Sequence, residues 1–399
     1  MSGVHIGARI AAERKLRGLN QRHLSDRAHV SHSLLTKVEQ GKRPASPALI
    51  SAVSRALDLD RGQLTGQPFR FNGRGDHAIH DLVPPLRREI LSAFLAPETD
   101  RPAPSVAELR TAVAELSGRA EAGDLAAVGV QLPEVLADLR LASHMYDGHQ
   151  REQVMRLWAE AIGAGRGFTR GLGYFDLALV LADQYDVIAP QSADPLCMTL
   201  GVTKRAQDFV AVGDPDTALA LLQRARDDLE PLVAENRPEA VSVYGYLHLR
   251  SALATARAAD ADRTNEHWHE ATVCARRIGG DHNHYGLSFG PTNVGIWGVG
   301  LAVELMNPGL ALTRHRSLRI APDMTPSRVG HHYVDLARGQ LLAGDRQAAV
   351  RSLQVARQVA PQQTRYHPMV RETVAAIALA EKRSTEPLRA LATWIGLDR

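Results

Sequence analysis

The chain is poor in cysteine and has no long apolar run. Its 399 residues contain two cysteines, Cys197 and Cys274, and no CxxC pair, which excludes a disulfide framework. The longest apolar stretch, residues 294–305, is short and rich in glycine, so we predict no membrane-spanning helix and no membrane partner. Because no signal peptide opens the chain, we expect a reduced, cytoplasmic protein.

The motifs that most enzymes and metalloproteins need are also absent from the sequence. It contains no Walker loop, no nucleotide-binding glycine fingerprint and no nucleophile elbow. The glycine-rich residues 163–168 follow helical sequence and predict a turn. His267 and His269 would point about 200° apart on a helix, and no HExxH motif or Cys/His quartet accompanies them. We therefore expect no enzymatic activity, no cofactor and no metal.

Aromatic residues make up only 5% of the chain, whereas alanine, leucine and arginine are abundant. This composition is typical of an all-α protein, and the length allows two or three domains. Charge is unevenly distributed. Residues 1–66 hold eleven Lys/Arg against five Asp/Glu, a net charge of +6, while the remainder holds 36 against 39, a net charge of −3. A basic N-terminal region on a mildly acidic body suits a chain whose N-terminus alone contacts a polyanion.

Residues 19–43 have the pattern of a helix-turn-helix that binds DNA. Gln21 opens a short apolar-patterned helix, residues 28–30 make the turn, and Ser31 is the N-cap of a second helix that stops at Gly41. The apolar positions of the second helix leave its opposite face polar. That face is free to meet base edges and phosphates, and it carries His32, Ser33, Thr36 and Lys37.

Residues 6–64 resemble the XRE (Cro and phage-repressor-like) family in register over a whole five-helix domain. The apolar positions that match are Ile6, Ile10, Leu16, Leu19, Leu49, Val53, Leu57 and Leu64. The resemblance implies a partly buried salt bridge between Arg14 and Glu39. One departure is His29, which stands where a glycine is usual in the turn, but histidine tolerates a left-handed backbone better than most residues. The family's DNA contacts, with the polar face above, predict a binding surface made of Asn20, Gln21, Arg22, Ser31, His32, Ser33, Thr36, Lys37, Gln40, Lys42 and Arg43.

The remaining chain divides into a linker and a helical repeat region. Residues 67–84 are rich in Gly and Pro and lack periodicity, which predicts a linker or hinge. Residues 85–399 show amphipathic helices separated by short turns, the best of which are Gly123-Asp124, Gly213-Asp214, Ala259-Asp260 and Gly344-Asp345.

The helical region carries the alanine and large-residue pattern of degenerate tetratricopeptide repeats. The clearest unit uses Tyr333, Leu336, Ala337, Ala349, Leu353, Ala356 and Pro361. A second uses Ala206, Ala218, Leu222 and Ala225, and a third uses Ala252, Trp268 and Ala271. Weaker units near Val128, Gly173 and Leu310 bring the total to about six. We predict an all-α fold in which the helix-turn-helix domain precedes an α-solenoid of tetratricopeptide-like hairpins; the alternative is an irregular helical bundle.

The whole arrangement resembles an actinobacterial class of regulators that often carries a PheGlyProThrAsnVal segment, present here at residues 289–294. Its architecture is also similar to peptide-pheromone receptors, in which a repeat domain binds a signal and repositions two DNA-binding domains. The match is architectural and identifies no ligand.

Polar and aromatic residues interrupt the repeats after residue 281. Asn293 could pair with a peptide backbone, Arg328 could hold a carboxylate or phosphate, and Trp297 could supply stacking surface. Purely structural roles are equally consistent with the pattern: Asn293 caps a helix, or Asp335 and Arg338, three positions apart, pair only with each other. The predicted ligand-binding set is Tyr285, Asn293, Trp297, Arg328, His332 and Asp335.

These features together predict a transcriptional regulator. We expect it to bind a double-stranded DNA operator with an inverted repeat as a homodimer, and to sense a small-molecule or peptide effector through its repeats. The alternative is an interaction scaffold or antitoxin-like adaptor whose repeats hold a protein partner. A third and weaker alternative is an enzyme with an unrecognised helical active site.

Overall fold

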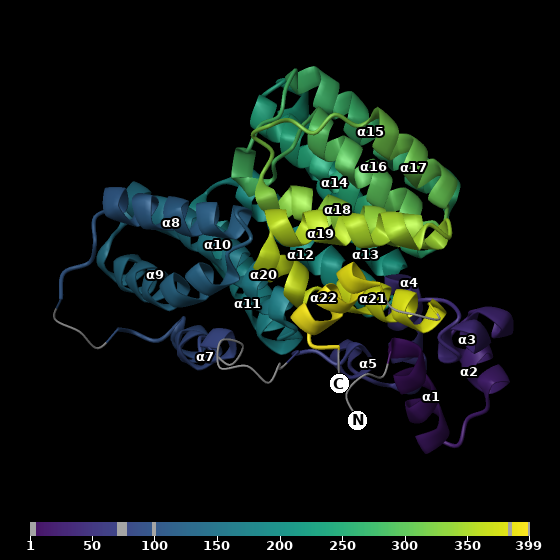
Figure 1. The fold of residues 1–399 in the computed structure, drawn as a ribbon. Coiled ribbons are helices and arrows are strands. Elements are labelled where there is room, and N and C mark those ends of the chain that lie inside the picture. Colours follow the sequence, from purple (N-terminus) through teal and green to yellow (C-terminus); the bar gives the residue numbers. More distant parts are fainter. Residues whose placement is uncertain (1–4, 70–77, 98–100, 382–384, 398–399) are drawn as a thin grey trace.

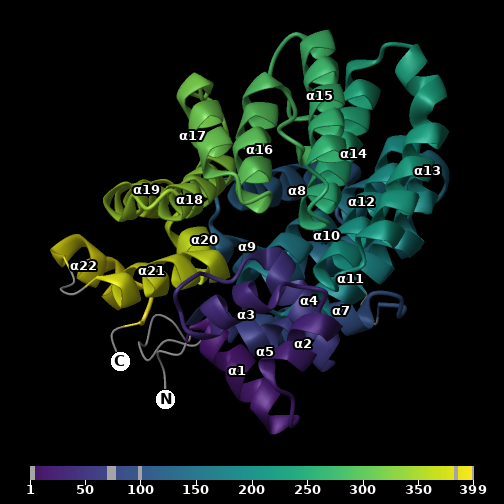
Figure 2. The same cartoon turned by 90° about the vertical axis from the view of Figure 1, so that its right-hand side faces the viewer.

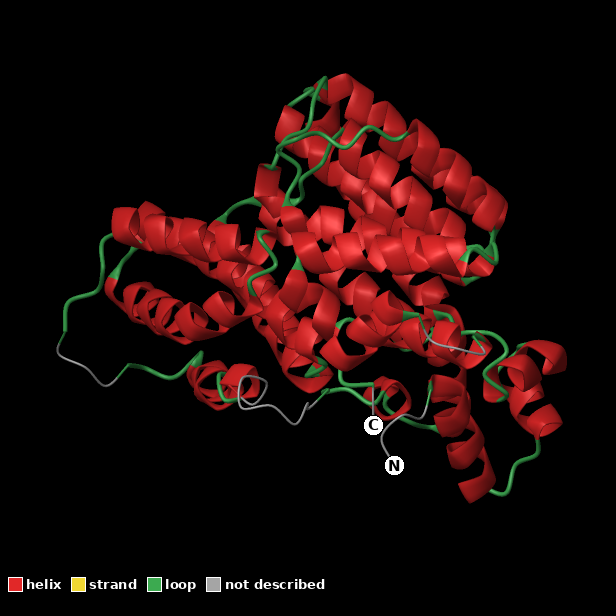
Figure 3. Cartoon of the chain, in the orientation of Figure 1, coloured by secondary structure: helices red, strands yellow, loops and turns green. Residues whose placement is uncertain are grey.

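The computed structural model describes residues 5–69, 78–97, 101–381 and 385–397 and is all-helical over them (Figures 1 and 3). No strand forms in these ranges; the only pairing of that kind is an isolated bridge between His282 and Phe289. None of the described helices is long and apolar enough to cross a bilayer. The predicted all-α class is confirmed.

The N-terminal part, called the head below, consists of five helices, as the sequence predicted. Their bounds are α1 (Ile6–Leu16), α2 (Gln21–Arg27), α3 (His32–Glu39), α4 (Pro47–Leu57) and α5 (Arg61–Thr65). A side chain that accepts a backbone N–H caps each of them, with His5 before α1, Asn20 before α2, Ser31 before α3, Ser46 before α4 and Asp60 before α5. Leu16, one of the apolar positions that match the family, lies in α1 as its last residue and is 79% exposed.

Over its described residues, the remainder, called the body, contains α7 (Val83–Ser92), six helical hairpins and three terminal helices (Figure 2). The hairpins are α8 (Val106–Glu121) with α9 (Leu125–Met145), α10 (Gly148–Leu172) with α11 (Phe175–Ile188), α12 (Pro195–Ala211) with α13 (Pro215–Ala234), α14 (Pro238–Arg257) with α15 (Ala261–Ile278), α16 (Pro291–Glu304) with α17 (Pro308–Ser317), and α18 (Pro326–Leu342) with α19 (Arg346–Val359). The terminal helices are α20 (Pro361–Tyr366), α21 (Pro368–Ala380) and α22 (Glu386–Trp394).

Five of the six hairpins turn by the same local chemistry. A residue with positive φ ends the first helix, and the next residue, an Asp or Asn, caps the second with its side chain. The pairs are Gly123-Asp124, Gly213-Asp214, Ala259-Asp260, Met306-Asn307 and Gly344-Asp345. The α10–α11 hairpin also turns through a left-handed glycine, Gly173, but Tyr174 provides no side-chain cap. The four turns predicted from the sequence all lie where expected.

Successive hairpins pack through their first helices, so that α12, α14, α16 and α18 lie side by side. The alanines of the predicted repeat pattern are all buried where helices approach closely; they are Ala206, Ala218, Ala225, Ala252, Ala271, Ala337, Ala349 and Ala356. This packing produces a repeat-like helical region that places the polar side chains of neighbouring first helices near one another.

The head is docked on the C-terminal helices of the body (Figure 1). Buried side chains of the head, including Ile6 and Ala45, form one apolar cluster with side chains of α18, α19, α21 and α22, including Met369 and Val374. The described ends of the predicted linker are packed as well, since Phe69 is buried and its carbonyl contacts the ring of His80 over 2.8 Å. Residues 70–77 of that linker lie outside the described residues.

Candidate nucleic-acid interface and inner polar cluster

Helix α3 is held by its apolar side and presents its polar side to solvent. Leu35 and Val38 are buried in the head. The Ser31 hydroxyl accepts the backbone N–H of Leu34 over 3.2 Å, so the helix begins as predicted. His29 in the preceding turn has the left-handed φ of 52° that its position requires. The exposed members of the predicted DNA-binding set are Asn20, Arg22, Ser31, His32, Ser33, Lys37, Gln40 and Lys42, while Arg43 is half-buried.

A two-pronged salt bridge fixes the orientation of α3 against α1. Arg14 donates Nε to Oε1 of Glu39 over 2.7 Å and Nη2 to Oε2 over 2.8 Å, and its Nη1 reaches the Leu19 carbonyl. Burial raises the pKa of Glu39, but the hydrogen bonds from Arg14 and Gln21 outweigh it and hold that pKa below its usual value. The pair implied by the XRE resemblance is therefore present. Such a pair fixes geometry more than it adds stability.

Gln21 and Thr36, two of the predicted DNA-contacting residues, belong to this network. Gln21 donates Nε2 to Glu39 over 2.7 Å, and its amide oxygen accepts the hydroxyl of Thr36 over 3.2 Å. Asn20 caps α2 by accepting the N–H of His23 over 2.8 Å. These side chains brace the helix-turn-helix, so any contact they make with DNA would share atoms already engaged within the head.

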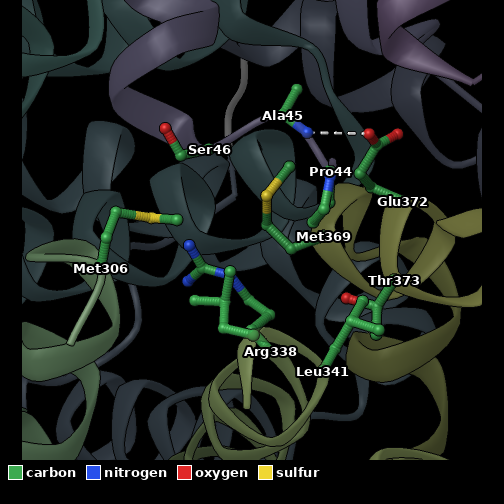
Figure 4. Close-up of a pocket in the computed structure, with 10 residues that line it drawn as sticks. Pro44, Ala45, Ser46, Met306, Arg338, Leu341, Met369, Glu372 and Thr373 are labelled. Atoms are coloured by element: carbon green, nitrogen blue, oxygen red, sulfur yellow. Dashed lines mark hydrogen bonds between the residues drawn. The ribbon is translucent and has the colours of Figure 1, made fainter. Parts of the chain in front are cut away.

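The head docks on the body through the start of α1, the loop before α4, and α4 itself. Glu372 in α21 accepts the N–H of Ile6 over 3.2 Å and the N–H of Ala45 over 2.9 Å. Arg55 in α4 donates to the Gly213 carbonyl over 2.6 Å. A small crevice lies beside Glu372 and is lined by Ala45, Met306, Arg338 and Met369 among others (Figure 4).

The predicted ligand-binding residues come together only in part. Asn293 is buried; it donates Nδ2 to the Leu287 carbonyl over 3.2 Å and accepts Nε of Arg328 over 2.9 Å. The Arg328 guanidinium also lies 5.5 Å from the centroid of the Trp297 ring. The Trp297 Nε1 group is buried without a hydrogen-bond partner among the described residues. Asn293, Trp297 and Arg328 therefore form one group.

The other members of that set lie elsewhere or are engaged. Tyr285 donates its hydroxyl to Asp194 over 2.8 Å, in a separate cluster. His332 is fully buried, contacts His315 over 3.1 Å, and has its pKa lowered to about 4, chiefly by burial. Asp335 accepts Nη1 of Arg338 over 2.8 Å, which is the structural pairing that the sequence left open.

Two ion-paired groups join side chains of the first helices of the hairpins. Arg338 joins Asp335 to Glu304, whose other oxygen lies 3.3 Å from Nε of Arg257. Further along, Asp208 accepts hydrogen bonds from both Arg166 and Arg170. The three carboxylates are thus each committed to arginines.

Four further cations lie within electrostatic reach of these ion pairs, and we call them the inner basic cluster: Arg61, Lys204, Arg250 and Arg328. Among the described residues, no carboxylate lies within ion-pair distance of any of the four. They come from α5, α12, α14 and α18, so no local sequence pattern links them. The sequence predicted Arg328 alone. The described residues contain no group of three His, Cys, Asp or Glu side chains placed to hold a metal ion.

A short capped helix followed by a braced, polar-faced second helix is the geometry of a helix-turn-helix that enters the DNA major groove. Residues 5–65 match a family described as helix-turn-helix domain, HTH_31, which indicates a DNA-binding regulator.

Comparison with curated proteins gives no match. Among solved structures, the chain is similar to BtubC (BKLC) from P. vanneervenii, with 17% identity, coverage of 70% of this chain and 96% of that chain, and a TM-score of 0.37. A likeness this loose bears on neither fold nor function.

Proposed function

We propose that this protein is a sequence-specific transcriptional regulator whose head binds operator DNA and whose helical body senses a small effector. The observation that carries the proposal is the placement of α3. Its buried side is fixed by Leu35, Val38 and the Arg14–Glu39 pair, while His32, Ser33 and Lys37 stay exposed after the head has docked on the body. A reading helix that is rigidly oriented and unobstructed suits major-groove recognition.

In the proposed mechanism, the effector acts on DNA binding by changing the contacts between the head and the body. Two heads of a homodimer must present α3 to major grooves about one helical turn apart, so small changes in how each head is seated change affinity for an inverted repeat. Effector binding to a tetratricopeptide-like body would shift the α18–α21 region. The carboxylate of Glu372, which accepts two backbone N–H groups of the head, would move with it. Coupling of this kind amounts to about 1–3 kcal/mol in typical allosteric proteins.

The reading helix can be tested with DNA selected from a random pool by the full-length protein. Replacing His32, Ser33 and Lys37 together by alanine is expected to abolish sequence-selective binding while the melting temperature stays near that of wild type, because all three are exposed. Thr36→Ala would remove the remaining predicted contact on this face of α3. It also removes a hydrogen bond to Gln21, so it is tested in a separate variant. The matched control is Arg224→Ala, an exposed cation on α13. Unchanged selectivity in the triple variant would show that α3 does not read DNA.

Oligomeric state is tested independently by light scattering of the protein with and without the selected DNA. A dimer on an inverted repeat supports the proposal. A single protein copy on a single half-site, bound with full affinity, argues against operator binding by a dimer.

A further inference from the structure

A cavity of ≈ 330 Å³ opens among α15, α16 and α17, which lie side by side (Figure 2). Its size is at the lower end of the roughly 300–1,000 Å³ of pockets that bind small molecules. Three residues of α16 line it: Pro291, Thr292 and Gly295. Asn293 and Trp297 project from the opposite side of the same helix. The cavity is therefore separate from the ligand-binding group that the sequence predicted.

Two glycines of α16 allow the walls of the cavity to approach that helix. Trp268 in α15 donates its Nε1 to the Val294 carbonyl over 2.9 Å, and a Cβ at Gly298 would lie only 2.9 Å from atoms of its ring. A Cβ at Gly295 would lie 2.6 Å from Cδ1 of Leu318, which also lines the cavity. Larger residues at either position would displace these walls, so the shape of the cavity depends on the absence of side chains there.

Two arginines line the cavity, and neither is paired with a carboxylate of the described residues. The guanidinium carbon of Arg314 lies 4.0 Å from the centroid of the Trp268 ring. The same group donates to the Gly298 carbonyl over 2.8 Å and to the side-chain oxygen of Asn265 over 3.0 Å. Arg319 is exposed and donates to two backbone carbonyls of its own segment, each over 3.3 Å. All these acceptors are neutral, so the charge of both arginines remains uncompensated.

The cavity is consequently a positively charged site. Burial lowers the pKa of Arg314, and no neighbouring carboxylate offsets that effect. The lining contains two arginines and no acidic residue. Asp281 adjoins it, but its carboxylate accepts the backbone N–H of Thr292 over 3.0 Å. A negative charge inside the cavity would therefore be stabilised, and it would in turn stabilise the guanidinium of Arg314.

We propose that this cavity binds a small organic acid, whose carboxylate is held by Arg314 and Arg319 and whose apolar part lies against Trp268, Pro291 and Leu318. The inference names the effector class of the sensing body and rests on the function proposed above. Guanidinium groups bind carboxylates in a two-pronged manner. An apolar wall with a few polar groups at one place is the usual make-up of a small-molecule site, and it fixes the orientation of the ligand.

The chemistry of the lining favours a carboxylate over a phosphate ester. A phosphate ester carries about −1.5 to −2 charges at neutral pH and has three strong acceptor oxygens. The cavity offers two guanidinium groups, and that of Arg314 already uses two of its donors within the protein. A single carboxylate needs fewer donors, and the apolar walls suit the ring or chain that carries it.

The cavity lies one helix away from the part of the body that holds the head. His315, which follows Arg314 in α17, contacts His332 of α18 over 3.1 Å. Helix α18 packs against α21, where Glu372 accepts two backbone N–H groups of the head. A ligand that draws Arg314 toward its carboxylate would thus act on α17, and through α17 on α18, which gives occupancy a route to the contacts between body and head.

The test is calorimetric titration of the full-length, DNA-free protein with sodium cinnamate, an aromatic carboxylate, with melting temperatures measured in parallel. Wild type is expected to bind cinnamate and to melt at a higher temperature in its presence. Cinnamyl alcohol, which lacks the charge, and acetate, which lacks the ring, should each bind at least about tenfold more weakly. Phenyl phosphate tests the alternative anion.

Two variants at exposed positions of the lining localise the site without disturbing the fold. Arg319→Gln should weaken binding of cinnamate about tenfold, and Ser317→Phe should abolish it by filling the cavity. Arg316→Gln, an exposed change on the same helix outside the lining, is the matched control and should bind as wild type does. Arg314→Gln should also weaken binding, but it removes two internal hydrogen bonds, so Arg319→Gln is the deciding variant.

The outcomes separate this inference from the proposed function. No binding of cinnamate by wild type, undiminished binding by Arg319→Gln, or equal binding of cinnamyl alcohol each overturns the inference, and tighter binding of phenyl phosphate overturns the carboxylate class. Binding to selected DNA is measured with and without cinnamate, and an unchanged DNA affinity overturns the effector role. A protein that binds DNA selectively but not cinnamate refutes this inference alone, whereas one that binds cinnamate but no DNA refutes the proposed function.

Discussion

Ala45 donates its backbone N–H to the carboxylate of Glu372 over 2.9 Å, although 327 positions separate the two residues. The second oxygen of the same carboxylate accepts the N–H of Ile6. Burial raises the pKa of Glu372, and the two N–H donors partly offset that effect. One buried side chain thus satisfies two backbone donors of the head, at the start of α1 and at the loop before α4.

Glu372→Gln should weaken the docking of the head on α21. A glutamine oxygen can accept one N–H, but its amide group would face the other donor and leave it unpaired, at a cost of about 1–3 kcal/mol. Amide hydrogen exchange at Ile6 and Ala45 should become faster, and the free energy of unfolding should fall. Glu115→Gln, an exposed change on α8, is the control. Unaltered exchange at both amides would mean that the carboxylate does not hold the head.

Glu39→Ala should destabilise the head by about 3–5 kcal/mol, because it leaves the buried guanidinium of Arg14 without its partner. Adding Arg14→Met removes that charge and should recover much of the loss. DNA binding should not recover in the double variant, since the bracing of α3 through Gln21 is gone. Chemical denaturation and DNA titration measure the two effects. Strictly additive destabilisation in the double variant would contradict this account.

Lys37→Ala should reduce the salt dependence of DNA binding. If Lys37 contacts a phosphate, the slope of log K against log[salt] should fall in magnitude by about 1, with similar weakening on all DNA sequences. Titrations at several salt concentrations check this, with Lys15→Ala, an exposed lysine on α1, for comparison. A changed sequence preference with an unchanged slope would instead assign Lys37 to base recognition.

Acid should destabilise the protein through four buried or half-buried histidines. Burial lowers the pKa of His248 and His367 to about 3, and that of His267 and His332 to about 4. The folded state therefore holds fewer protons than the unfolded state once the pH falls below about 6.5, and stability is lost from there down to pH 3–4. Each such group adds about 1.4 kcal/mol per pH unit to the slope.

Unfolding free energies between pH 4.5 and 7 test that sign. His267 lies 3.1 Å from His248, Nδ1 to Nδ1, and His267→Gln should make the slope shallower. His269→Gln, an exposed change two positions along α15, serves as the control. Stability that rises on acidification would contradict the assignment of neutral rings in the folded state.

Local chemistry made the head and the hairpin turns predictable. The Ser31 cap, the left-handed His29 and the Asp caps after Gly123, Gly213 and Gly344 each depend on neighbours within a few positions, so their residue types are enough to locate them. The Met306-Asn307 turn was harder to predict, because a methionine with positive φ has no sequence signal.

Contacts between distant segments were not predictable. Glu372 is an ordinary helical glutamate in sequence, and only the docked head makes it a paired acceptor. Arg250 likewise belongs to a chain with many arginines, and its burial depends on the packing of α14 against α12 and α16. Tyr285 was grouped with Asn293 because it is near in sequence, but it contacts Asp194 instead.

The bond between Ala45 and Glu372 also has a consequence for biosynthesis. At roughly 5–20 residues per second, a ribosome that has made Ala45 needs about 15 to 65 seconds more to reach Glu372. Once α4 and α5 have also been made, the head has its own five helices but not yet the body on which it docks, so the surface that later packs against α21 faces solvent. The nascent protein therefore passes through a stage at which it carries a helix-turn-helix that its body does not yet restrain.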